Sequence, residues 1–179
     1  MDRYWLLTWT TYGTWLPGDE RGFVSNVDRG DGVGHRVNRL GTEPSADIPR
    51  LENYARNKLC GSPVFLAESQ AEILLAQFHE TAAIRSWTLL AVAIMRSHIH
   101  VVVGVMADPD PATLLRDLKG YGSRALNRRF ECPASVTWWT ESGSRRRLPD
   151  ERAIAAAVEY VKHQNAPLLI WIPSATGTM

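Results

Sequence analysis

The chain has 179 residues, of which 45% are hydrophobic and 22% are charged, and its formal net charge is +1. This length fits one domain with a buried core, residues 1–179, and the near-neutral charge excludes a basic field over the whole surface. No apolar stretch reaches the roughly 18 residues of a membrane-spanning helix, the N-terminus lacks a signal-peptide pattern, and Cys60 and Cys132 form no CxxC pair, so we expect a cytoplasmic protein with free thiols.

The first expected element is a strand over residues 3–11, "RYWLLTWTT", which is rich in aromatic and β-branched residues. The composition then changes, because residues 13–63 are dense in Gly, Pro, Asp and Arg and show no sustained apolar period. We interpret this segment as a long, mostly irregular insertion, with short helical turns near residues 51–58. It is too long to be a simple connector.

The middle of the chain predicts a helix followed by a hairpin. Residues 66–86 carry apolar side chains at helical spacing, which indicates one buried face. Two apolar runs follow, at residues 87–95 and 98–105, and each is typical of a strand. Only Arg96 and Ser97 separate the two runs, so a tight turn must join them.

The C-terminal third predicts two helices and a strand between them. The first helix lies within residues 108–130 and begins at Asp and Pro, which favour helix starts. The strand is expected over residues 134–143, "ASVTWWTESG". The last helix is expected from Asp150 to Asn165, with Pro167 stopping its continuation.

The first six regular elements therefore follow the order strand, helix, strand, strand, helix, strand. This order predicts an α+β fold of the ferredoxin-like, split-βαβ type, with an antiparallel sheet and both crossover helices on one face. The strand at residues 98–105 then lies near the centre of the sheet, and the other face is open for a ligand. The C-terminal helix is an addition to this unit.

Two histidines interrupt the apolar run "MRSHIHVVVGV" at residues 95–105. Side chains alternate across a strand, so His98 and His100 should share one face while the intervening aliphatic side chains are buried on the other. Imidazoles in such a run indicate a metal site or a phosphate site.

The last helix carries a tyrosine surrounded by small residues. Tyr160 shares a stripe with Gln164 and with three alanines, Ala153, Ala156 and Ala157. One interpretation is an ordinary tyrosine at the edge of the core. The alternative is a nucleophile followed, one helical turn later, by an amide that could serve as a third metal ligand.

Together these residues resemble the single-tyrosine HUH transposases, which include small bacterial insertion-sequence enzymes and the REP-associated tyrosine transposases. The matching motifs are "HIH", Y-x-x-x-Q at residues 160–164, "LKGYGSRALNRRF" and "WWTESGSRRRL". The opening "LLTWTTYGTWLPGDERG" is similar to a subgroup with an enlarged N-terminal loop.

The resemblance implies that His98, His100 and Gln164 bind a divalent cation, Mg²⁺ or Mn²⁺. It further implies that Tyr160 attacks a phosphate of single-stranded, hairpin-containing DNA and forms a 5′-phosphotyrosine. The free 3′-hydroxyl later attacks this adduct, so the strands are rejoined without ATP. A neutral phenol is a poor nucleophile, and a nearby cation favours its phenolate and offsets charge on the phosphoryl group.

Some residues rival these assignments. His163 lies three residues after Tyr160 and competes with Gln164 as a ligand, and Asn165 is a weaker rival. Tyr121 is a rival nucleophile, although it lies in a helix that holds DNA in the related proteins. The family pattern favours Tyr160 and Gln164.

Other functional classes fit less well. A nucleotide hydrolase with alternating histidines requires H-x-H-x-H, and Val102 occupies the third position. An RNA-binding module of this fold requires exposed aromatics on its central strands, where this chain has histidines. Replication initiators and relaxases are larger and often have paired tyrosines. The main alternative is a catalytically inactive or host-retained protein of the same ancestry that binds hairpin DNA.

Basic residues cluster in two segments and are candidates for DNA contacts: Arg116, Lys119, Arg124, Arg128, Arg145, Arg146 and Arg147. Trp138 and Trp139 should point to opposite faces of a strand. One interpretation packs one of them in the core and stacks the other on a base, and the alternative, which is the commoner role of a tryptophan, places each in the core. The resemblance is compatible with a monomer or a homodimer.

Overall fold

A computed structural model of the chain describes residues 3–19 and 48–174. Its sheet has five strands in the order β4-β1-β3-β2-β5, and all neighbouring strands are antiparallel. The strands are β1 (Arg3–Thr10), β2 (Trp87–Ile94), β3 (His98–Val105), β4 (Ser144–Leu148) and β5 (Leu169–Trp171). The helices are α1 (Pro49–Asn57), α2 (Glu68–Arg85), α3 (Pro111–Asn127) and α4 (Glu151–Lys162).

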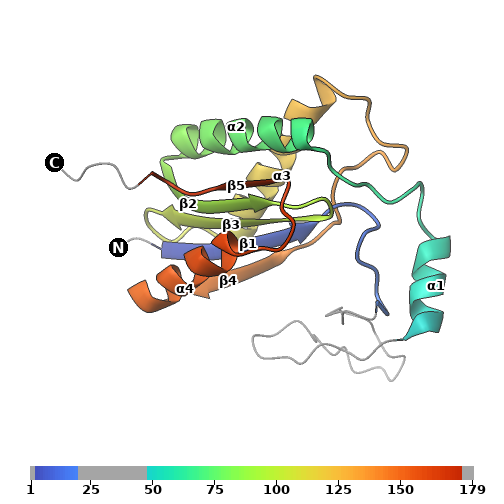
Figure 1. Cartoon of the computed structure of the whole chain (residues 1–179), viewed down its shortest axis with the longest axis horizontal. Coiled ribbons are helices and arrows are strands. Elements are labelled where there is room, and N and C mark those ends of the chain that lie inside the picture. The colour runs from blue at the N-terminus through green and yellow to red at the C-terminus, as the bar shows by residue number, and fades with distance from the viewer. Residues whose placement is uncertain (1–2, 20–47, 175–179) are drawn as a thin grey trace.

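The first four strands confirm the ferredoxin-like prediction. Their order, β4-β1-β3-β2, is that of the split-βαβ unit, and β3 lies at the centre of the five-stranded sheet. The crossover helices α2 and α3 pack on one face, whereas α4 lies across the other (Figure 1). The face expected to be open is therefore partly covered by α4, which leaves room for a ligand at one end.

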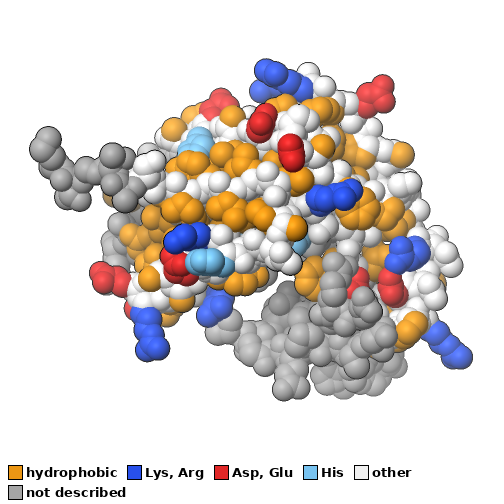
Figure 2. All heavy atoms as spheres, in the orientation of Figure 1, with side chains coloured by type: hydrophobic (Ala, Val, Ile, Leu, Met, Phe, Trp, Pro, Cys, Tyr) orange, Lys and Arg blue, Asp and Glu red, His pale blue; other side chains and the backbone are white. Residues whose placement is uncertain are grey.

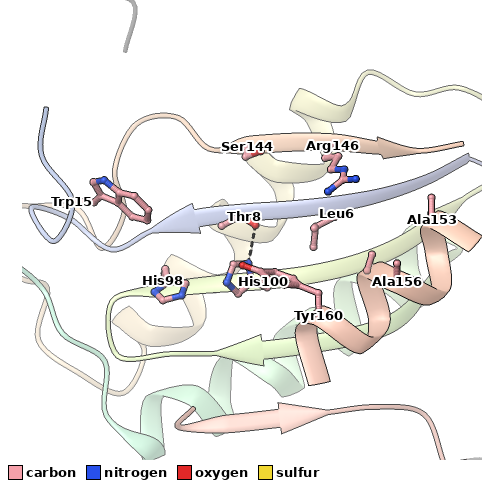
Figure 3. Close-up of a pocket in the computed structure, with 11 residues that line it drawn as sticks. Leu6, Thr8, Trp15, His98, His100, Ser144, Arg146, Ala153, Ala156 and Tyr160 are labelled. Carbon is pink, nitrogen blue, oxygen red and sulfur yellow. Dashed lines mark hydrogen bonds between the residues drawn. The ribbon is translucent and has the colours of Figure 1, made fainter. Parts of the chain in front are cut away.

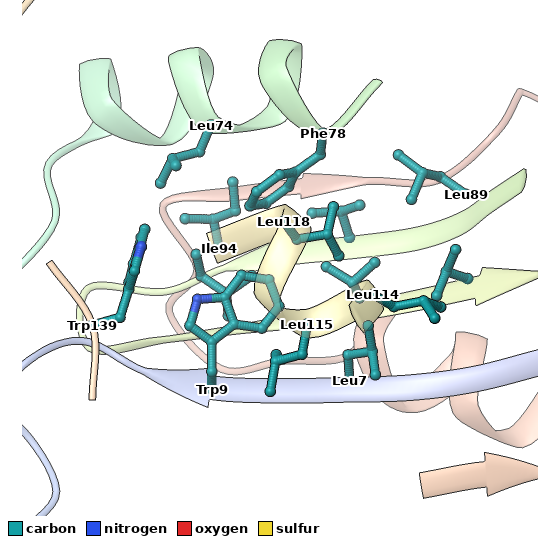
Figure 4. Close-up of a cluster of buried hydrophobic side chains, with 14 of the residues drawn as sticks. Leu7, Trp9, Leu74, Phe78, Leu89, Ile94, Leu114, Leu115, Leu118 and Trp139 are labelled. Atoms are coloured by element: carbon teal, nitrogen blue, oxygen red, sulfur yellow. The ribbon is translucent and has the colours of Figure 1, made fainter. Parts of the chain in front are cut away.

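The larger core fills the space between the sheet and the two crossover helices. It contains Trp9, whose ring packs edge-on against Phe78 and Trp139, with centroids 5.8 and 6.2 Å apart (Figure 4). Side chains from α2 and α3, including Leu74 and Leu118, are fully buried against it. Since α2 and α3 both insert into this core, it fixes the helix layer on β1, β2 and β3.

A smaller core joins α4 to the other face. Ala157 and Val161 are its buried residues on the helix, and they face small or aliphatic side chains of the sheet such as Ala93 and Val102. Asp150 caps the start of α4 by accepting a hydrogen bond from the backbone N–H of Ala153 at 2.8 Å. This cap sets where the helix begins and therefore which residues face the sheet.

The strand expected over residues 134–143 is wrong, since β4 begins only at Ser144. Trp138 and Trp139 are both buried, and each indole N–H is bonded: to the Asn127 side chain at 2.7 Å and to the Lys119 carbonyl at 3.0 Å. The two indole side chains anchor the loop that precedes β4, and this segment does not form the expected strand. The interpretation that places each of the two tryptophans in the core is confirmed.

Two features near the ends of the sheet complete the comparison with expectation. The three-residue strand β5, which pairs with β2, was not predicted. Helix α1 confirms the helical turns near residues 51–58, and the rest of the insertion expected over residues 13–63 is described only outside 20–47. In the ranges that the structure describes, no helix has the length and apolar character to cross a membrane.

Two glycine-to-alanine changes should have opposite effects on the free energy of unfolding. A Cβ at Gly143 would lie 2.7 Å from the carbonyl oxygen of Thr8, so β4 must shift, and Gly143→Ala should cost about 1–3 kcal/mol. A Cβ at Gly120, within α3, meets nothing within 4 Å, so Gly120→Ala should stabilise by about 1 kcal/mol. Urea unfolding of both variants measures these changes. A Gly143→Ala protein with the same free energy of unfolding as the parent would contradict the close packing at the start of β4.

Candidate active site

A cavity of about 670 Å³ lies between α4 and the sheet, at the end where β1, β3 and β4 meet the helix. Side chains from four separate elements and one loop line it (Figure 3). The polar or aromatic ones are Thr8, Trp15, His98, His100, Ser144, Arg146 and Tyr160. The alanines of α4 that face it, Ala153, Ala156 and Ala157, keep the space free.

The alternation of β3 confirms that the two histidines share a face. Ile99 and Val101 are fully buried in the core on the other side. The rings of His98 and His100 lie with centroids 4.9 Å apart and planes at 83°. The cavity therefore presents two imidazoles side by side.

His100 is held in a defined orientation. Only 4% of the residue is exposed, and its Nδ1 lies 2.8 Å from the hydroxyl of Thr8, which is its direct partner across β1 and β3. Its Nε2 is buried and has no hydrogen-bond partner among the described residues. Burial, and secondarily the neighbouring His98, lowers the pKa of His100 to about 4. The imidazole is thus neutral near pH 7, with one nitrogen unsatisfied.

Tyr160 enters the same cavity from α4. Its ring centroid is 5.2 Å from that of His100, with the planes at 79°, and 51% of the residue is exposed. The side chain is thus held beside the imidazole and still open to an incoming ligand. The structure brings Tyr160, His98 and His100 together, as the sequence pattern suggested.

Gln164 does not line this cavity. Helix α4 ends at Lys162, three residues before the predicted end, and the Gln164 amide donates to the carbonyl of Tyr160 at 3.0 Å. The rival ligand His163 is also directed elsewhere, because its Nδ1 lies 2.9 Å from the carbonyl of Glu159. Neither side chain therefore supplies a third donor in this conformation.

The donor set fits a metal ion in part. The neutral imidazole of His100, whose Nε2 has no partner among the described residues, is a suitable ligand, and His98 offers a second imidazole beside it. Two imidazole ligands leave coordination positions for oxygen donors such as phosphate and water. Within residues 3–19 and 48–174, no group of three or more His, Cys, Asp or Glu residues is placed to hold a metal. His98 and His100 are the two residues here that could hold one.

Of the seven basic residues singled out, Arg146 is the one that lines the cavity. It pairs with Leu6 across β4 and β1 and so shares the face of the histidines, whereas Arg145 and Arg147 pair with Leu7 and Trp5 on the opposite face. Figure 2 shows Lys and Arg side chains standing apart on the visible face rather than in one basic patch.

The basic residues of α3 and of its C-cap, Arg128, lie on the helix layer behind the sheet. Arg116, Arg124 and Arg128 are exposed there, and Arg124 sits over the ring of Tyr121 at 4.9 Å. Lys119 instead directs its ammonium to three loop carbonyls, those of Thr140, Glu141 at 3.0 Å and Ser142 at 3.1 Å. Lys119 thus holds the loop that leads into β4.

Sequence reasoning missed Thr8 and Trp15. Thr8 looked like any residue of an alternating strand, and its contact with His100 depends on the pairing of β1 with β3. Trp15 lies within the segment interpreted as an irregular insertion, where the "YGTW" motif was the available signal. Thr8 can be assigned to the site only once the pairing of β1 with β3 is known, and Trp15 only once the path of the loop after β1 is known.

Acid should destabilise the metal-free protein through His100. In the unfolded chain the imidazole takes up a proton below pH 6.5, whereas in the folded protein it does so only near pH 4. The contribution of His100 to the free energy of unfolding is therefore fully present above pH 6.5 and is lost as the pH falls from 6.5 to 4. This contributes a loss of about 3 kcal/mol in the free energy of unfolding. Urea unfolding at both pH values in chelator should show a smaller loss in His100→Gln; equal losses would contradict the assignment.

A family model described as "Transposase IS200 like" matches residues 62–164, which include both histidines, Tyr160 and Gln164. A comparison with curated proteins finds no match.

Two solved structures resemble the fold. One is a REP-associated tyrosine transposase bound to a REP hairpin, with a TM-score of 0.48 and 12% identity, covering 89% of this chain and 64% of the other. The second is a protein of Deinococcus radiodurans R1 described as a candidate transposase, with a TM-score of 0.46 and 15% identity, covering 93% of each chain. The chain thus spans 64% of the length of the first.

Proposed function

Because the chain belongs to the family of IS200-like transposases, we propose that it cuts and rejoins single-stranded DNA through a covalent bond between Tyr160 and a 5′-phosphate. Membership of this family supports a role in DNA transposition. One observation carries the finer proposal: the Tyr160 ring lies 5.2 Å from that of the neutral His100, inside a cavity that also contains Arg146. A phenol, two imidazoles and a guanidinium are together suited to phosphoryl transfer.

The proposed substrate is a single strand near a hairpin. A cavity of about 670 Å³ between the sheet and α4 has room for a phosphate and a neighbouring nucleotide, but not for a double helix. The hairpin is the form that the resemblance to REP-associated transposases implies. The phosphate would enter beside Arg146, whose guanidinium is the basic group on this wall.

His98 and His100 would hold the divalent cation, Mg²⁺ or Mn²⁺. When bound, the ion polarises the phosphoryl group and offsets the charge that develops on it. Gln164 is the proposed third ligand, and its Oε1 would have to turn toward the cavity, which the side chain does not line in this conformation. Imidazole ligation makes Mn²⁺ a good substitute for Mg²⁺.

Tyr160 performs the exchange of bonds. Its phenolic oxygen forms a bond to phosphorus while the bond from phosphorus to the 3′-oxygen breaks, and the phenolic proton ends on that oxygen as a 3′-hydroxyl. Rejoining reverses these steps, since a 3′-hydroxyl attacks the phosphotyrosine and returns the phenol. The number of phosphodiester-type bonds is conserved, so no nucleotide hydrolysis is needed.

Thr8 keeps the Nε2 of His100 available for the cation. Because the Thr8 hydroxyl lies 2.8 Å from Nδ1, it can accept a hydrogen bond from an Nδ1–H group, and this tautomer leaves Nε2 with a free lone pair. Thr8→Val keeps the shape and removes the acceptor, so we expect roughly 10-fold to 100-fold weaker metal affinity with little change in folding. Mn²⁺ titration monitored by electron paramagnetic resonance measures this, and unchanged affinity would contradict the role; Thr8→Ser is the matched control.

Covalent capture tests the proposed function. Tiled single-stranded oligonucleotides from both flanks of the gene are incubated with protein and Mg²⁺, Mn²⁺ or chelator, and then separated on a denaturing gel. The proposal predicts an adduct that forms with metal and is absent with chelator. Retarded DNA in native gels without an adduct under either metal would overturn the proposal and favour the non-cutting hairpin-binding protein.

A further inference from the structure

A second cavity, of about 440 Å³, adjoins the first. It lies between the loop that follows β1 and the loop that precedes β4, and its aromatic walls are Tyr12, Trp15 and Trp139. Trp15 lines both cavities, so the two share a wall. Figure 3 shows Trp15 at the end of the first cavity, beyond Thr8 and His98.

The two cavities differ in charge. The first contains Arg146 and the two histidines, and therefore suits a phosphate. Among the described residues that line the second, the charged one is Glu141, whose carboxylate repels phosphate. An anionic strand that passes both cavities would thus place its phosphate in the first and an uncharged part in the second.

Apart from the Glu141 carboxylate, the walls of the second cavity offer ring faces, and several of their polar groups are already hydrogen-bonded. The Trp139 indole N–H donates to the Lys119 carbonyl at 3.0 Å, and the Tyr12 hydroxyl accepts from the backbone N–H of Cys60 at 2.7 Å. The Thr140 hydroxyl donates to the carbonyl of Thr11 at 3.1 Å. Such walls suit the face of a flat ring, because stacking on aromatic side chains depends on the ring face and not on a particular base edge.

We propose that this second cavity takes one unpaired nucleobase of a nucleotide that flanks the scissile phosphate, stacked on Trp15. The inference rests on the proposed function, because the phosphate in the first cavity positions the neighbouring base. Trp15 is 37% exposed and so presents ring surface to a ligand. By holding the base, Trp15 acts as a positioning residue that sets which phosphate lies beside Tyr160.

Binding of DNA to the uncleaving Tyr160→Phe protein tests this inference. The tile from the gene flanks that binds most tightly is made as a series with an abasic site at each position in turn, and affinities are measured by fluorescence polarisation. One position should weaken binding roughly tenfold or more when abasic, in line with the loss of one stacked base. Adding Trp15→Ala should weaken binding of the intact strand by a similar factor, and the abasic site should then cause no further loss of affinity. Trp15→Phe keeps an aromatic ring, so it should retain most of the affinity for the intact strand.

A base analogue provides a second readout. The fluorescence of 2-aminopurine at the sensitive position should be quenched when the strand binds the protein that retains Trp15. It should remain unquenched when the strand binds the Trp15→Ala variant. Tyr54→Ala, which removes an exposed aromatic residue outside both cavities, is the matched control and should behave as the parent protein. An abasic penalty that persists in Trp15→Ala, or no position-dependent penalty, would overturn the inference. Because these measurements need no cleavage, they are independent of whether an adduct forms.

Discussion

Replacing Tyr160 by phenylalanine is expected to abolish the covalent protein–DNA adduct completely. The change removes the single oxygen that can bond to phosphorus and keeps the ring beside His100, whose centroid lies 5.2 Å away. Tyr160 is half exposed, so the fold and the affinity for DNA should persist. Loss of the adduct with retained binding therefore reports on chemistry rather than on structure.

The site of attachment can be read directly from the peptide that carries the DNA. Trypsin cleaves after Arg152 and Lys162, and the resulting peptide 153–162 contains Tyr160 as its single tyrosine. After nuclease trimming, mass spectrometry should find the remaining nucleotide on this peptide. Tyr121→Phe is the matched control, since Tyr121 lies on α3 behind the sheet and its variant should form the adduct normally. A nucleotide on peptide 120–124 would identify Tyr121 as the nucleophile instead.

The second large effect is expected from His100→Gln. The change removes the buried Nε2 that is available for a metal and leaves an amide that can still contact Thr8. Since a bound cation contributes several kcal/mol to stabilising the charge of the transition state, adduct formation should fall by at least about a hundredfold. Binding of Mn²⁺ should weaken in parallel.

His163→Gln is the matched control for this change. His163 lies three residues after the proposed nucleophile Tyr160, but its side chain is exposed and its Nδ1 lies close to the carbonyl of Glu159. Its variant should retain both Mn²⁺ binding and adduct formation. If His163→Gln lost activity while His100→Gln kept it, the ligand assignment would have to be exchanged between them.

The sequence predicted best those parts whose pattern is set by local geometry. The alternation of β3 places His98 and His100 on one face because a strand has a strict period of two, and the core on its other side confirms it. The order of elements then leads to the sheet order, because few topologies satisfy it. Fold and histidine pair were therefore accessible without a structure.

The remaining parts depend on contacts between distant segments. Trp138 and Trp139 have strand-like composition, yet they serve as anchors for a loop, which periodicity cannot distinguish. The direction of the Gln164 amide depends on where α4 ends, and helix ends are poorly marked in this alanine-rich sequence. The neighbouring cavities that share Trp15 depend on a loop path that leaves no periodic signal.

Because β3 is paired on both sides, the site depends on which face of the sheet each residue of this strand occupies. Its neighbours β1 and β2 pair with it over almost its full length, so a shift by one residue would turn His98 and His100 into the core and direct Ile99 and Val101 toward the cavity. A single-residue insertion or deletion within β3 itself would cause this inversion on one side of the change unless a β-bulge absorbed it, as the irregularity between Leu89 and Ala91 does in β2. A two-residue change within β3 would preserve the facing of every side chain.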